Sequence, residues 1–287
     1  MKLSIITINY NNAAGLKNTL DSVASQTCTD FEHIIVDGAS TDGSVEIIRE
    51  YEQFLASNFS PLASSLKWIS EKDTGIYNAM NKGVRLAQGE YTLMLNSGDY
   101  LVDEHVIEKV IPLLDGTDII QGNTIEEYPD RIMRNRGYGK SDIDFFDVMK
   151  GYFLHQAAFC QRYLFDRYGM FDESYRIIGD TKFFMTCLGR ENASFRYIDV
   201  DISNYDITGI SSETLGKWVE RKIIEDARMR SELYSNRLNN FFEENDKKIR
   251  LYDTLHKHRW IWYMVMAIAH ICNYFYVGEP IVHRERL

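Results

Sequence analysis

The sequence predicts an α/β fold in which helices flank a mostly parallel sheet. Over the first hundred residues, short β-rich runs alternate with segments of helical periodicity. This repetition is typical of parallel strands joined by crossover helices. Polar clusters also follow three of the predicted strands, and such sheets bind ligands beyond the carboxyl ends of their strands. We therefore expect the polar clusters to line one crevice.

The predicted elements follow one another in a regular order. The strands cover residues 2–9, 31–37, 67–70 and 91–95, and the helices between them cover residues 16–25, 45–54 and 77–87. The polar clusters that follow strands are Asn9 to Asn11, Asp37 to Ser40, and Asn96 to Asp99.

The alternation weakens after residue 105. Residues 123–140 are polar and are predicted to form a loop. Four basic residues gather there: Arg131, Arg134, Arg136 and Lys140. Such a cluster is usually a solvated surface. The alternative, that it attracts an anionic acceptor, stays open because basic residues beside a cleft concentrate phosphate groups.

The C-terminal part is predicted to be a helical extension, residues 213–287, that follows a main domain of residues 1–212. Apolar residues recur at helical spacing between residues 215 and 240. Residues 260–277 carry no Asp, Glu, Lys or Arg and are rich in Trp and Tyr. This length is marginal for crossing a bilayer, and these aromatic residues prefer interfaces. We expect the segment to pack on its own domain or to lie on a membrane surface.

Composition excludes several classes of protein. The net charge of −10 argues against a nucleic-acid binder, which needs a basic surface. The four cysteines are far apart and show no pattern of a disulfide framework. Residues 1–12 lack the hydrophobic region and cleavage site of a signal peptide. We therefore expect a cytoplasmic protein, peripheral to the inner face of the membrane if residues 260–277 contact it.

Three blocks carry a resemblance to a known family. The stretch from Thr7 to Ser44, which begins TINYNN and contains IIVDGASTDGS, resembles the opening of the family 2 glycosyltransferases. EKDTGIYNAMNKG at residues 71–83 and GEYTLMLNSGD at residues 89–99 continue the match. The resemblance covers residues 3–212. It implies a GT-A fold with a Rossmann-like sheet, and a sugar transfer from a nucleotide diphosphate that inverts the anomeric centre.

The resemblance also assigns residues to the donor site. It implies that Thr7, Asn9 and Tyr10 line the nucleotide pocket, and that Asp37 contacts the uracil or ribose of a uridine nucleotide. A carboxylate suits this role because it accepts hydrogen bonds from an imide N–H or a hydroxyl. The alternative is that Asp37 only caps the turn into the next helix.

The second and third blocks add further donor residues. The resemblance places Asp73, Asn78, Asn81 and Ser97 near the donor. Asn78 and Asn81 lie at helical spacing, so the alternative is that their amides only form local hydrogen bonds.

Residues 96–99 occupy the place of the family's metal motif, Asp-x-Asp-Asp. Asn96 and Gly98 stand where the family commonly has acids, which leaves Asp99 as the predicted ligand of Mn²⁺ or Mg²⁺. One acid suffices where diphosphate oxygens and waters complete the shell of a hard cation. The alternative is an ordinary β-turn.

The block from His155 to Phe184 matches the acceptor side of the family. The position of its catalytic base falls on Asp180, and Gly179 stands where Glu is common. A carboxylate there would take the proton of the attacking hydroxyl. His155 and Gln156 are placed at the acceptor, with a structural histidine as the alternative.

Beyond this block, residues 209–211 resemble a loop near the diphosphate, whose backbone N–H groups bind phosphate oxygens. Thr208 replaces the first Gly of that loop.

The leading hypothesis is therefore a metal-dependent glycosyltransferase that uses a UDP-sugar and acts on a saccharide or lipid-linked saccharide in surface polysaccharide synthesis. Two alternatives remain: a non-catalytic nucleotide-sugar-binding protein, which the reduced acidic motif would suit, and a sugar nucleotidyltransferase. The latter is weaker because residues 5–12 contain no glycine or basic residue for a phosphate loop. A dehydrogenase is disfavoured because no G-x-G-x-x-G follows the first strand.

Overall fold

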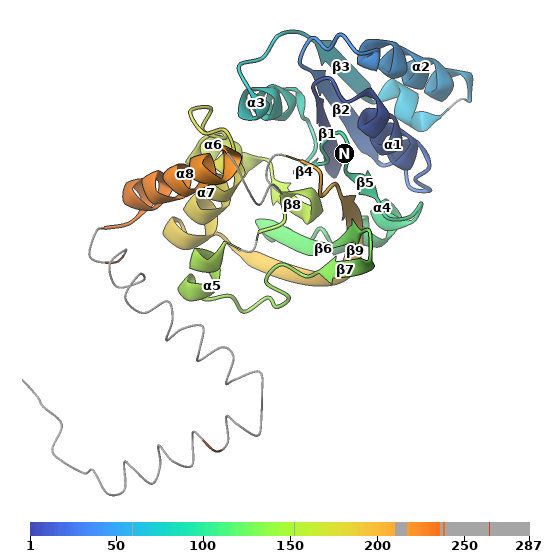
Figure 1. Ribbon diagram of the computed structural model, residues 1–287. Coiled ribbons are helices and arrows are strands. Elements are labelled where there is room, and N and C mark those ends of the chain that lie inside the picture. Colours follow the sequence, from blue (N-terminus) through green and yellow to red (C-terminus); the bar gives the residue numbers. More distant parts are fainter. Residues whose placement is uncertain (59, 152, 210–216, 236–237, 239–263, 265–287) are drawn as a thin grey trace, which may run out of the picture. The chain divides into compact units, whose positions relative to one another are not determined.

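The computed structural model describes residues 1–58, 60–151, 153–209, 217–235, 238 and 264. The chain divides into two compact units, Met1–Met229 and Arg230–Leu287. In its described part, the first unit contains a nine-stranded mixed sheet with helices against it (Figure 1). The strand order is β3-β2-β1-β4-β8-β6-β9-β5, and β7 pairs with β6.

The first half of the sheet confirms the predicted alternation. Its elements are β1 (Leu3–Asn9), α1 (Ala13–Ala24), β2 (Phe31–Asp37), α2 (Ser44–Ser57), a 3₁₀ turn (Pro61–Ser64), β3 (Leu66–Ser70), α3 (Ile76–Leu86) and β4 (Tyr91–Met94). β1 pairs in parallel with β2 and β4, and β2 pairs in parallel with β3. Every residue of β1 and β2 is buried, as expected for central strands covered on both faces.

The second half adds antiparallel pairs. Its elements are β5 (Tyr100–Leu101), α4 (Val106–Val110), a 3₁₀ turn (Ile111–Leu113), β6 (Ile119–Tyr128), β7 (Arg131–Asn135), α5 (Phe145–Lys150), η3 (His155–Ala157), β8 (Ala158–Gln161), α6 (Tyr163–Tyr168), α7 (Gly179–Met185), a π-helical turn (Thr186–Arg190), β9 (Phe195–Tyr205) and α8 (Lys217–Leu233). β8 is antiparallel to both β4 and β6, and so joins the two halves of the sheet.

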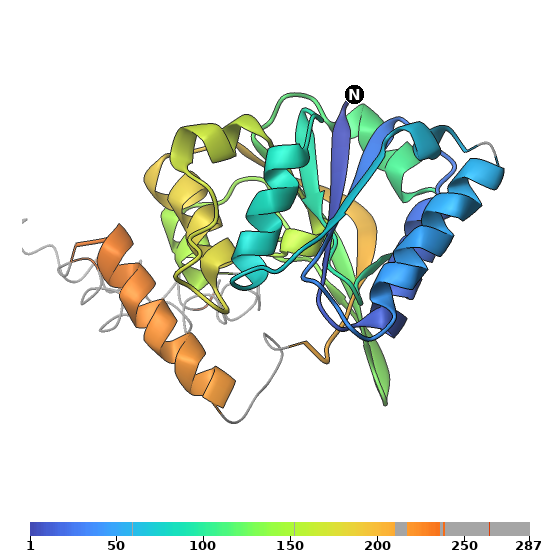
Figure 2. The same cartoon turned by 90° about the horizontal axis from the view of Figure 1, so that it is seen from above.

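Helices cover both faces of the sheet (Figure 2). Buried residues of α1, α2 and α4 form one core with Leu3 and Ile5 of β1. α3 packs on the other face, where a Cβ at Gly83 would lie 2.3 Å from Cγ2 of Ile6. This glycine therefore lets α3 approach the sheet closely.

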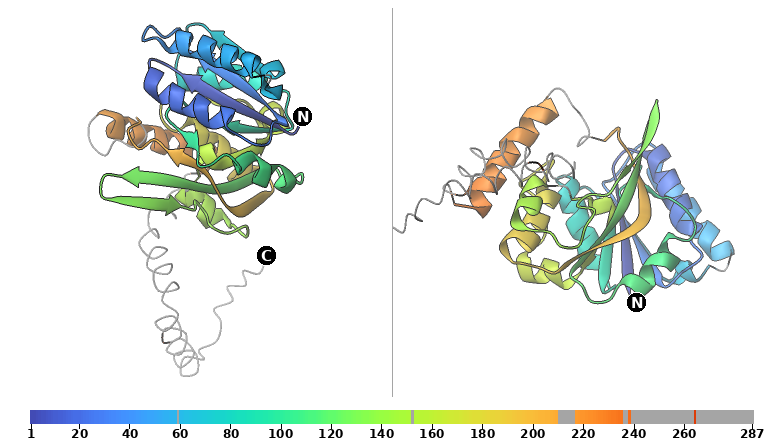
Figure 3. Two further views of the ribbon diagram at one scale, coloured as in Figure 1. Left: turned by 90° about the vertical axis from the view of Figure 1, so that its right-hand side faces the viewer. Right: turned by 90° about the horizontal axis from the view of Figure 1, so that it is seen from below.

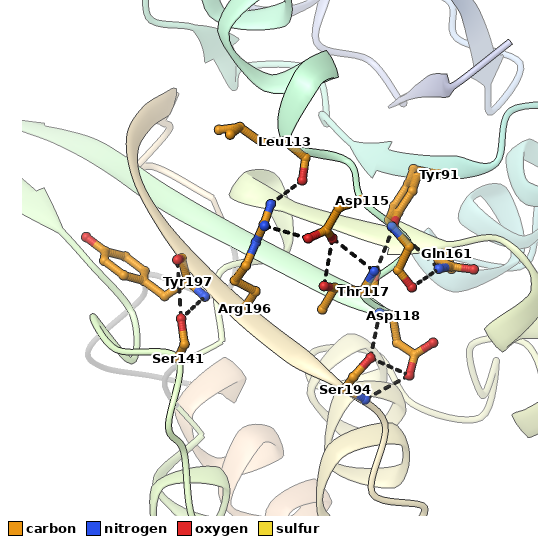
Figure 4. A network of polar contacts seen from close by, with 11 residues as sticks. Tyr91, Leu113, Asp115, Thr117, Asp118, Ser141, Gln161, Ser194, Arg196 and Tyr197 are labelled. Carbon is orange, nitrogen blue, oxygen red and sulfur yellow. Dashed lines mark hydrogen bonds and ion pairs between the residues drawn. The ribbon is translucent and has the colours of Figure 1, made fainter.

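A polar network closes the edge of the sheet at which β4 begins (Figure 4). The Tyr91 hydroxyl donates to the carbonyl of Thr117 and accepts the N–H of Gly116, both at 2.8 Å. Asp118 accepts the backbone N–H and the hydroxyl of Ser194. These bonds are at the edge opposite to the carboxyl end of β4.

The loop predicted for residues 123–140 is wrong, because β6 and β7 form a hairpin that pairs from Thr124 with Asn135 to Tyr128 with Arg131 (Figure 3). All five residues of β7 are outside the core. Because β7 has no buried face, its sequence shows no alternation of apolar and polar residues. The polar composition of the segment therefore led to the loop prediction.

The basic cluster in this region is neutralised by ion pairs. Arg134 pairs with Asp199 and Asp201, and Arg136 with Asp199. Lys140 pairs with Asp147, and Arg131 with Asp130. The arrangement favours the solvated-surface reading over an anion site, because each positive charge already has a carboxylate.

α8 confirms a helix in the predicted C-terminal region, but the first compact unit continues past residue 212 into this helix. Glu225 and Met229 are buried. Of residues 260–277, all but Met264 lie outside the described residues. No helix in the part of the chain that the structure describes is long and apolar enough to cross a membrane.

Candidate active site

The three predicted polar clusters meet at the carboxyl ends of β1, β2 and β4. Nδ2 of Asn9 donates to Oδ1 of Asp37 at 2.8 Å, and Nδ2 of Asn12 donates to the carbonyl of Ser97 at 3.1 Å. In the described part of the chain, the buried Oδ1 atoms of Asn9 and Asn96 have no hydrogen-bond partner. Orphaned buried acceptors at the ligand edge of a sheet are suited to a donor group from a ligand.

Asp37 is fully buried and is held by several donors. Its carboxylate accepts from Asn9, from the backbone N–H and hydroxyl of Ser40, and from the hydroxyl of Ser70. Burial alone would raise the pKa of Asp37, but these bonds outweigh burial and lower it. Asp37 therefore stays ionised and organises the turn after β2, as the capping alternative expects.

Thr7 is placed differently from the prediction. Its side chain is 0% exposed, and its hydroxyl lies 3.0 Å from Nε2 of His33, inside the core. Nδ1 of His33 lies 3.0 Å from the Tyr51 hydroxyl, and burial lowers the pKa of His33 to about 3. The Thr7 side chain is thus enclosed in the core and offers no surface to a ligand. Tyr10, by contrast, is 66% exposed at the end of β1.

Asp73, predicted for the donor site, lies beside the second cluster. Its Oδ1 accepts the N–H of Gly75 at 2.9 Å, and a Cβ at Gly38 would lie 2.6 Å from its Oδ2. Asp73 therefore reaches the turn that follows Asp37.

Asn78 and Asn81 act differently from Asp73, because both bind the segment before α7. Asn78 and Asn81 donate to Glu173 at 2.9 Å, and Asn81 also bonds the N–H and the carbonyl of Phe171. Asn81 is 1% exposed. These bonds use its amide fully, so the structure favours a role in joining α3 to residues 171–173 over contact with the donor.

Asp99 is 4% exposed and is the buried acid of the third cluster. Its Oδ1 accepts the backbone N–H of Asp206 at 2.9 Å. Burial, with a contribution from the charge of Asp206, raises the pKa of Asp99 to about 7, although that N–H and nearby His155 oppose the shift. A buried acid with this property is suited to a divalent cation, which would replace the proton.

Asp206 is a residue that the sequence analysis missed. It follows β9, and a Cβ at Gly98 would lie 2.6 Å from its Oδ2. The space beside Gly98, where the family commonly has an acid, therefore holds an acid from another segment. In the sequence, the only sign of such an acid was that Gly98 stands where the family commonly has one. In the described residues, no group of three or more His, Cys, Asp or Glu side chains could hold a metal by itself.

Asp180 and His155 form a largely buried ion pair. Nδ1 of His155 lies 2.8 Å from Oδ2 of Asp180, and each side chain is 17% exposed. Burial disfavours both charges, but the contact between the two side chains outweighs burial. The pKa of Asp180 is therefore lowered and that of His155 is raised. Nε2 of His155 lies 3.3 Å from the Asn96 side-chain amide. His155 therefore connects the predicted base to the predicted metal turn.

Tyr77 is a second residue that the sequence analysis missed. Its hydroxyl donates to Oδ1 of Asp180 at 3.0 Å, across 103 residues of chain. Nothing in its block marked it, because a tyrosine in an amphipathic helix reads as core.

The remaining predicted positions are Gln156, Ser97 and the loop at residues 208–211. Gln156 is 4% exposed, so its side chain is poorly placed for an acceptor. Ser97 is half-buried, and its N–H donates to the carbonyl of Ile8. The Thr208 backbone and hydroxyl bond to Asp206, whereas Ile210 and Ser211 lie outside the described residues.

Comparison with known proteins shows the family of this chain. The model of the family described as "Glycosyl transferase family 2" matches residues 4–170. A "PGL/p-HBAD biosynthesis glycosyltransferase" of Mycobacterium bovis is 34% identical over 219 residues, which are 74% of this chain and 79% of that protein. An uncharacterized glycosyltransferase of Mycobacterium tuberculosis is 30% identical over 218 residues, 73% of this chain and 77% of that protein.

Two solved structures share the fold. Staphylococcus aureus TarS 1-349 in complex with UDP-GlcNAc has a TM-score of 0.60 at 19% identity, covering 77% of this chain and 61% of that one. A mannosyltransferase of Pyrobaculum calidifontis in complex with GDP-Man and Mn²⁺ has a TM-score of 0.55 at 18% identity, covering 97% and 76%. The GT-A fold is thereby confirmed. Together with the family model and the relatives, it establishes that this chain belongs to glycosyl transferase family 2.

Proposed function

We propose that this glycosyltransferase moves a sugar from a UDP-sugar to a hydroxyl of a saccharide or lipid-linked saccharide, with inversion at the anomeric carbon. The observation that carries the proposal is the contact of His155 with both Asp180 and Asn96. It brings the residue suited to be a base next to the turn suited to hold the diphosphate.

The donor is proposed to lie along the carboxyl ends of β1, β2 and β4. The orphaned Oδ1 of Asn9 and the exposed ring of Tyr10 support a nucleotide there. Uridine is favoured because the solved TarS structure contains UDP-GlcNAc. Asp37, Asp73 and Ser97 surround this edge and are proposed to complete the donor site.

Mn²⁺ or Mg²⁺ is the proposed cofactor, held by Asp99 with Asp206 beside it. The buried Asp99 carboxyl, whose pKa is raised, and the Asp206 carboxylate beside Gly98 fit a hard cation. When bound, such an ion neutralises the charge of the departing diphosphate. The Mn²⁺ in the Pyrobaculum calidifontis structure supports this assignment.

Asp180 is proposed to accept the proton of the acceptor hydroxyl. As that proton leaves, the hydroxyl oxygen bonds to the anomeric carbon, and the bond from this carbon to the diphosphate oxygen breaks. The nucleoside diphosphate departs with the electron pair, and no covalent sugar–enzyme intermediate forms. His155, which pairs with Asp180, is proposed to contact the acceptor.

The location of the enzyme is also a proposal. We place it in the cytoplasm at the inner membrane surface, where a lipid-linked acceptor would be available, because of the aromatic composition of residues 260–277. Synthesis of a surface polysaccharide is the proposed role.

Release of uridine diphosphate tests the proposal. With UDP-sugars, a saccharide acceptor and Mn²⁺, the wild-type protein should release uridine diphosphate, and Asp180→Asn should lose about a hundredfold or more of the rate, as expected for removal of a general base. An Asp180→Asn rate equal to wild type would exclude this base. Pyrophosphate as the product would indicate a nucleotidyltransferase, and binding without release a non-catalytic protein.

A further inference from the structure

The departure of this chain from the family at residue 179 has a physical explanation in the structure. Gly179 stands where the family commonly has Glu, at the first position of α7. Its φ is not in the left-handed region, so its lack of a side chain matters for space rather than for conformation. A Cβ at this position would lie 2.7–2.9 Å from three atoms of the Tyr77 ring. Tyr77 therefore occupies the space that a larger residue 179 would need.

The Tyr77 ring is held in one place. It is 3% exposed, its centroid lies 6.0 Å from that of Phe171, and its hydroxyl reaches Oδ1 of Asp180 at 3.0 Å. Burial and the charge of Asp180 raise the pKa of Tyr77 well above its usual value. The hydroxyl therefore keeps its proton and is always a donor.

Both oxygens of Asp180 are thereby fixed from different elements. Tyr77 of α3 donates to Oδ1, His155 of η3 contacts Oδ2, and the backbone N–H of Thr181 bonds the same carboxylate. A carboxylate has about four acceptor positions, so at least one remains for the proton of an incoming hydroxyl. The donors hold the carboxylate in one orientation before any acceptor arrives.

We propose that Tyr77 is a positioning residue, which orients the Asp180 carboxylate for proton transfer in the space that Gly179 leaves open. This inference rests on the proposed function, because it takes Asp180 as the base. The hydroxyl also stabilises the ionised carboxylate, since a hydrogen bond to a charged acceptor is stronger than one to a neutral acceptor. Its removal thus has two separable effects, on the rate and on the titration of Asp180.

Tyr77→Phe removes the hydroxyl and keeps the ring. We expect kcat to fall by roughly tenfold to a hundredfold, the loss of one hydrogen bond to a charged group, with the donor KM within about twofold of wild type. At saturating Mn²⁺, which would hold Asp99 deprotonated, the acidic limb of the rate profile should move up by about one pH unit, because the ionised form of Asp180 loses a donor. If Tyr77 served only for packing, its substitution would lower the free energy of unfolding and leave the acidic limb unchanged.

Tyr91→Phe is the matched control. Tyr91 is also buried, and its hydroxyl donates to Thr117 at 2.8 Å at the opposite edge of the sheet (Figure 4). The same substitution there should lower the free energy of unfolding and leave the limb unchanged. An equal shift in both variants, or none in Tyr77→Phe, would overturn the proposal.

A second readout does not depend on turnover. The ¹³C-carboxyl resonance of Asp180, assigned by its loss in Asp180→Asn, should titrate at higher pH in Tyr77→Phe than in wild type. If the wild-type protein transfers no sugar but this titration shifts, the proposed function fails and the Tyr77–Asp180 contact stands. An unshifted titration contradicts the contact, whatever the activity.

Gly179→Ala tests the space itself. Its methyl group would displace the Tyr77 ring, so kcat should fall as in Tyr77→Phe. Adding Tyr77→Phe to Gly179→Ala should then cost little more, because the hydroxyl has already lost Asp180. Fully additive losses would show that residue 179 acts by another route and would refute the coupling.

Discussion

At the residue scale, the two acids of the site differ in their surroundings. Burial dominates at Asp99 and raises its pKa to about 7, whereas the His155 contact outweighs burial at Asp180 and lowers the pKa there. Asp99 is therefore partly protonated at neutral pH in the absence of a cation, while Asp180 is ionised. This difference suits one acid to a metal ion and the other to a proton acceptor.

Asp99→Asn should stabilise the metal-free protein at alkaline pH. The folded protein holds the Asp99 proton more tightly than the unfolded chain, so Asp99 weakens the fold as pH rises from about 4 to about 7. At about pH 8 the variant should gain on the order of 2–4 kcal/mol in the free energy of unfolding, and near pH 4 almost nothing. Urea unfolding at both pH values measures this. A gain independent of pH would contradict the buried-charge explanation.

Asp206→Asn should weaken Mn²⁺ binding. It removes one negative charge beside Asp99 and keeps an oxygen to accept from Thr208, so the turn should survive. We expect about a tenfold rise in the Mn²⁺ dissociation constant in the presence of uridine diphosphate, by calorimetry. Thr208→Val is the control, because it removes a hydroxyl from the same turn without changing charge. Unchanged affinity in Asp206→Asn would exclude Asp206 from the metal site.

At the element scale, α8 supports the segment that leads to the base. Glu225 is 2% exposed and accepts the backbone N–H groups of Arg176, Ile177 and Ile178, directly before Gly179 and Asp180. Burial alone would raise the pKa of Glu225, but the hydrogen bond from Arg221 and these backbone bonds lower it. A helix outside the predicted main domain thus fixes the start of α7.

Glu225→Gln should loosen that start. One amide cannot replace a carboxylate that accepts three N–H groups, so the free energy of unfolding should fall by about 1–3 kcal/mol, with a lower kcat. Denaturant unfolding and rate measurements test this. Glu220→Gln, an exposed acid on the same helix, should change neither. Equal effects of the two substitutions would contradict the support described.

Sequence reasoning worked best for elements with at least one buried face. The apolar runs of β1 and β2 and the periodicity of α1 to α3 predicted the first half, because burial imposes a simple pattern on them. The β6–β7 hairpin was missed because β7 has no buried face. In the site, motif order led to the proposals for Asp99 and Asp180, whereas the His155 contacts with Asp180 and Asn96 came from the structure. Tyr77 and Asp206 were not predicted, since their contacts join segments more than 100 residues apart.

At the scale of the whole molecule, residues 1–229 form one compact unit that contains the candidate site. A chain that ends at residue 235 should therefore fold and release uridine diphosphate with a soluble acceptor. Its co-sedimentation with anionic lipid vesicles should be lost, if residues 260–277 form the membrane contact. Loss of folding would show that the first unit needs the second, and retained vesicle binding would place the membrane contact elsewhere.

The ring of His155 and the hydroxyl of Tyr77 tie the nucleotide half of the sheet to the half that follows β4. Engineers who graft the later half of a relative onto this chain would inherit a foreign residue at position 179. Unless that residue is glycine, it would collide with the tyrosine contributed by the host half. Chimeras that take residues 77 and 179 from the same parent should thus fold and stay active more often than chimeras that take them from different parents.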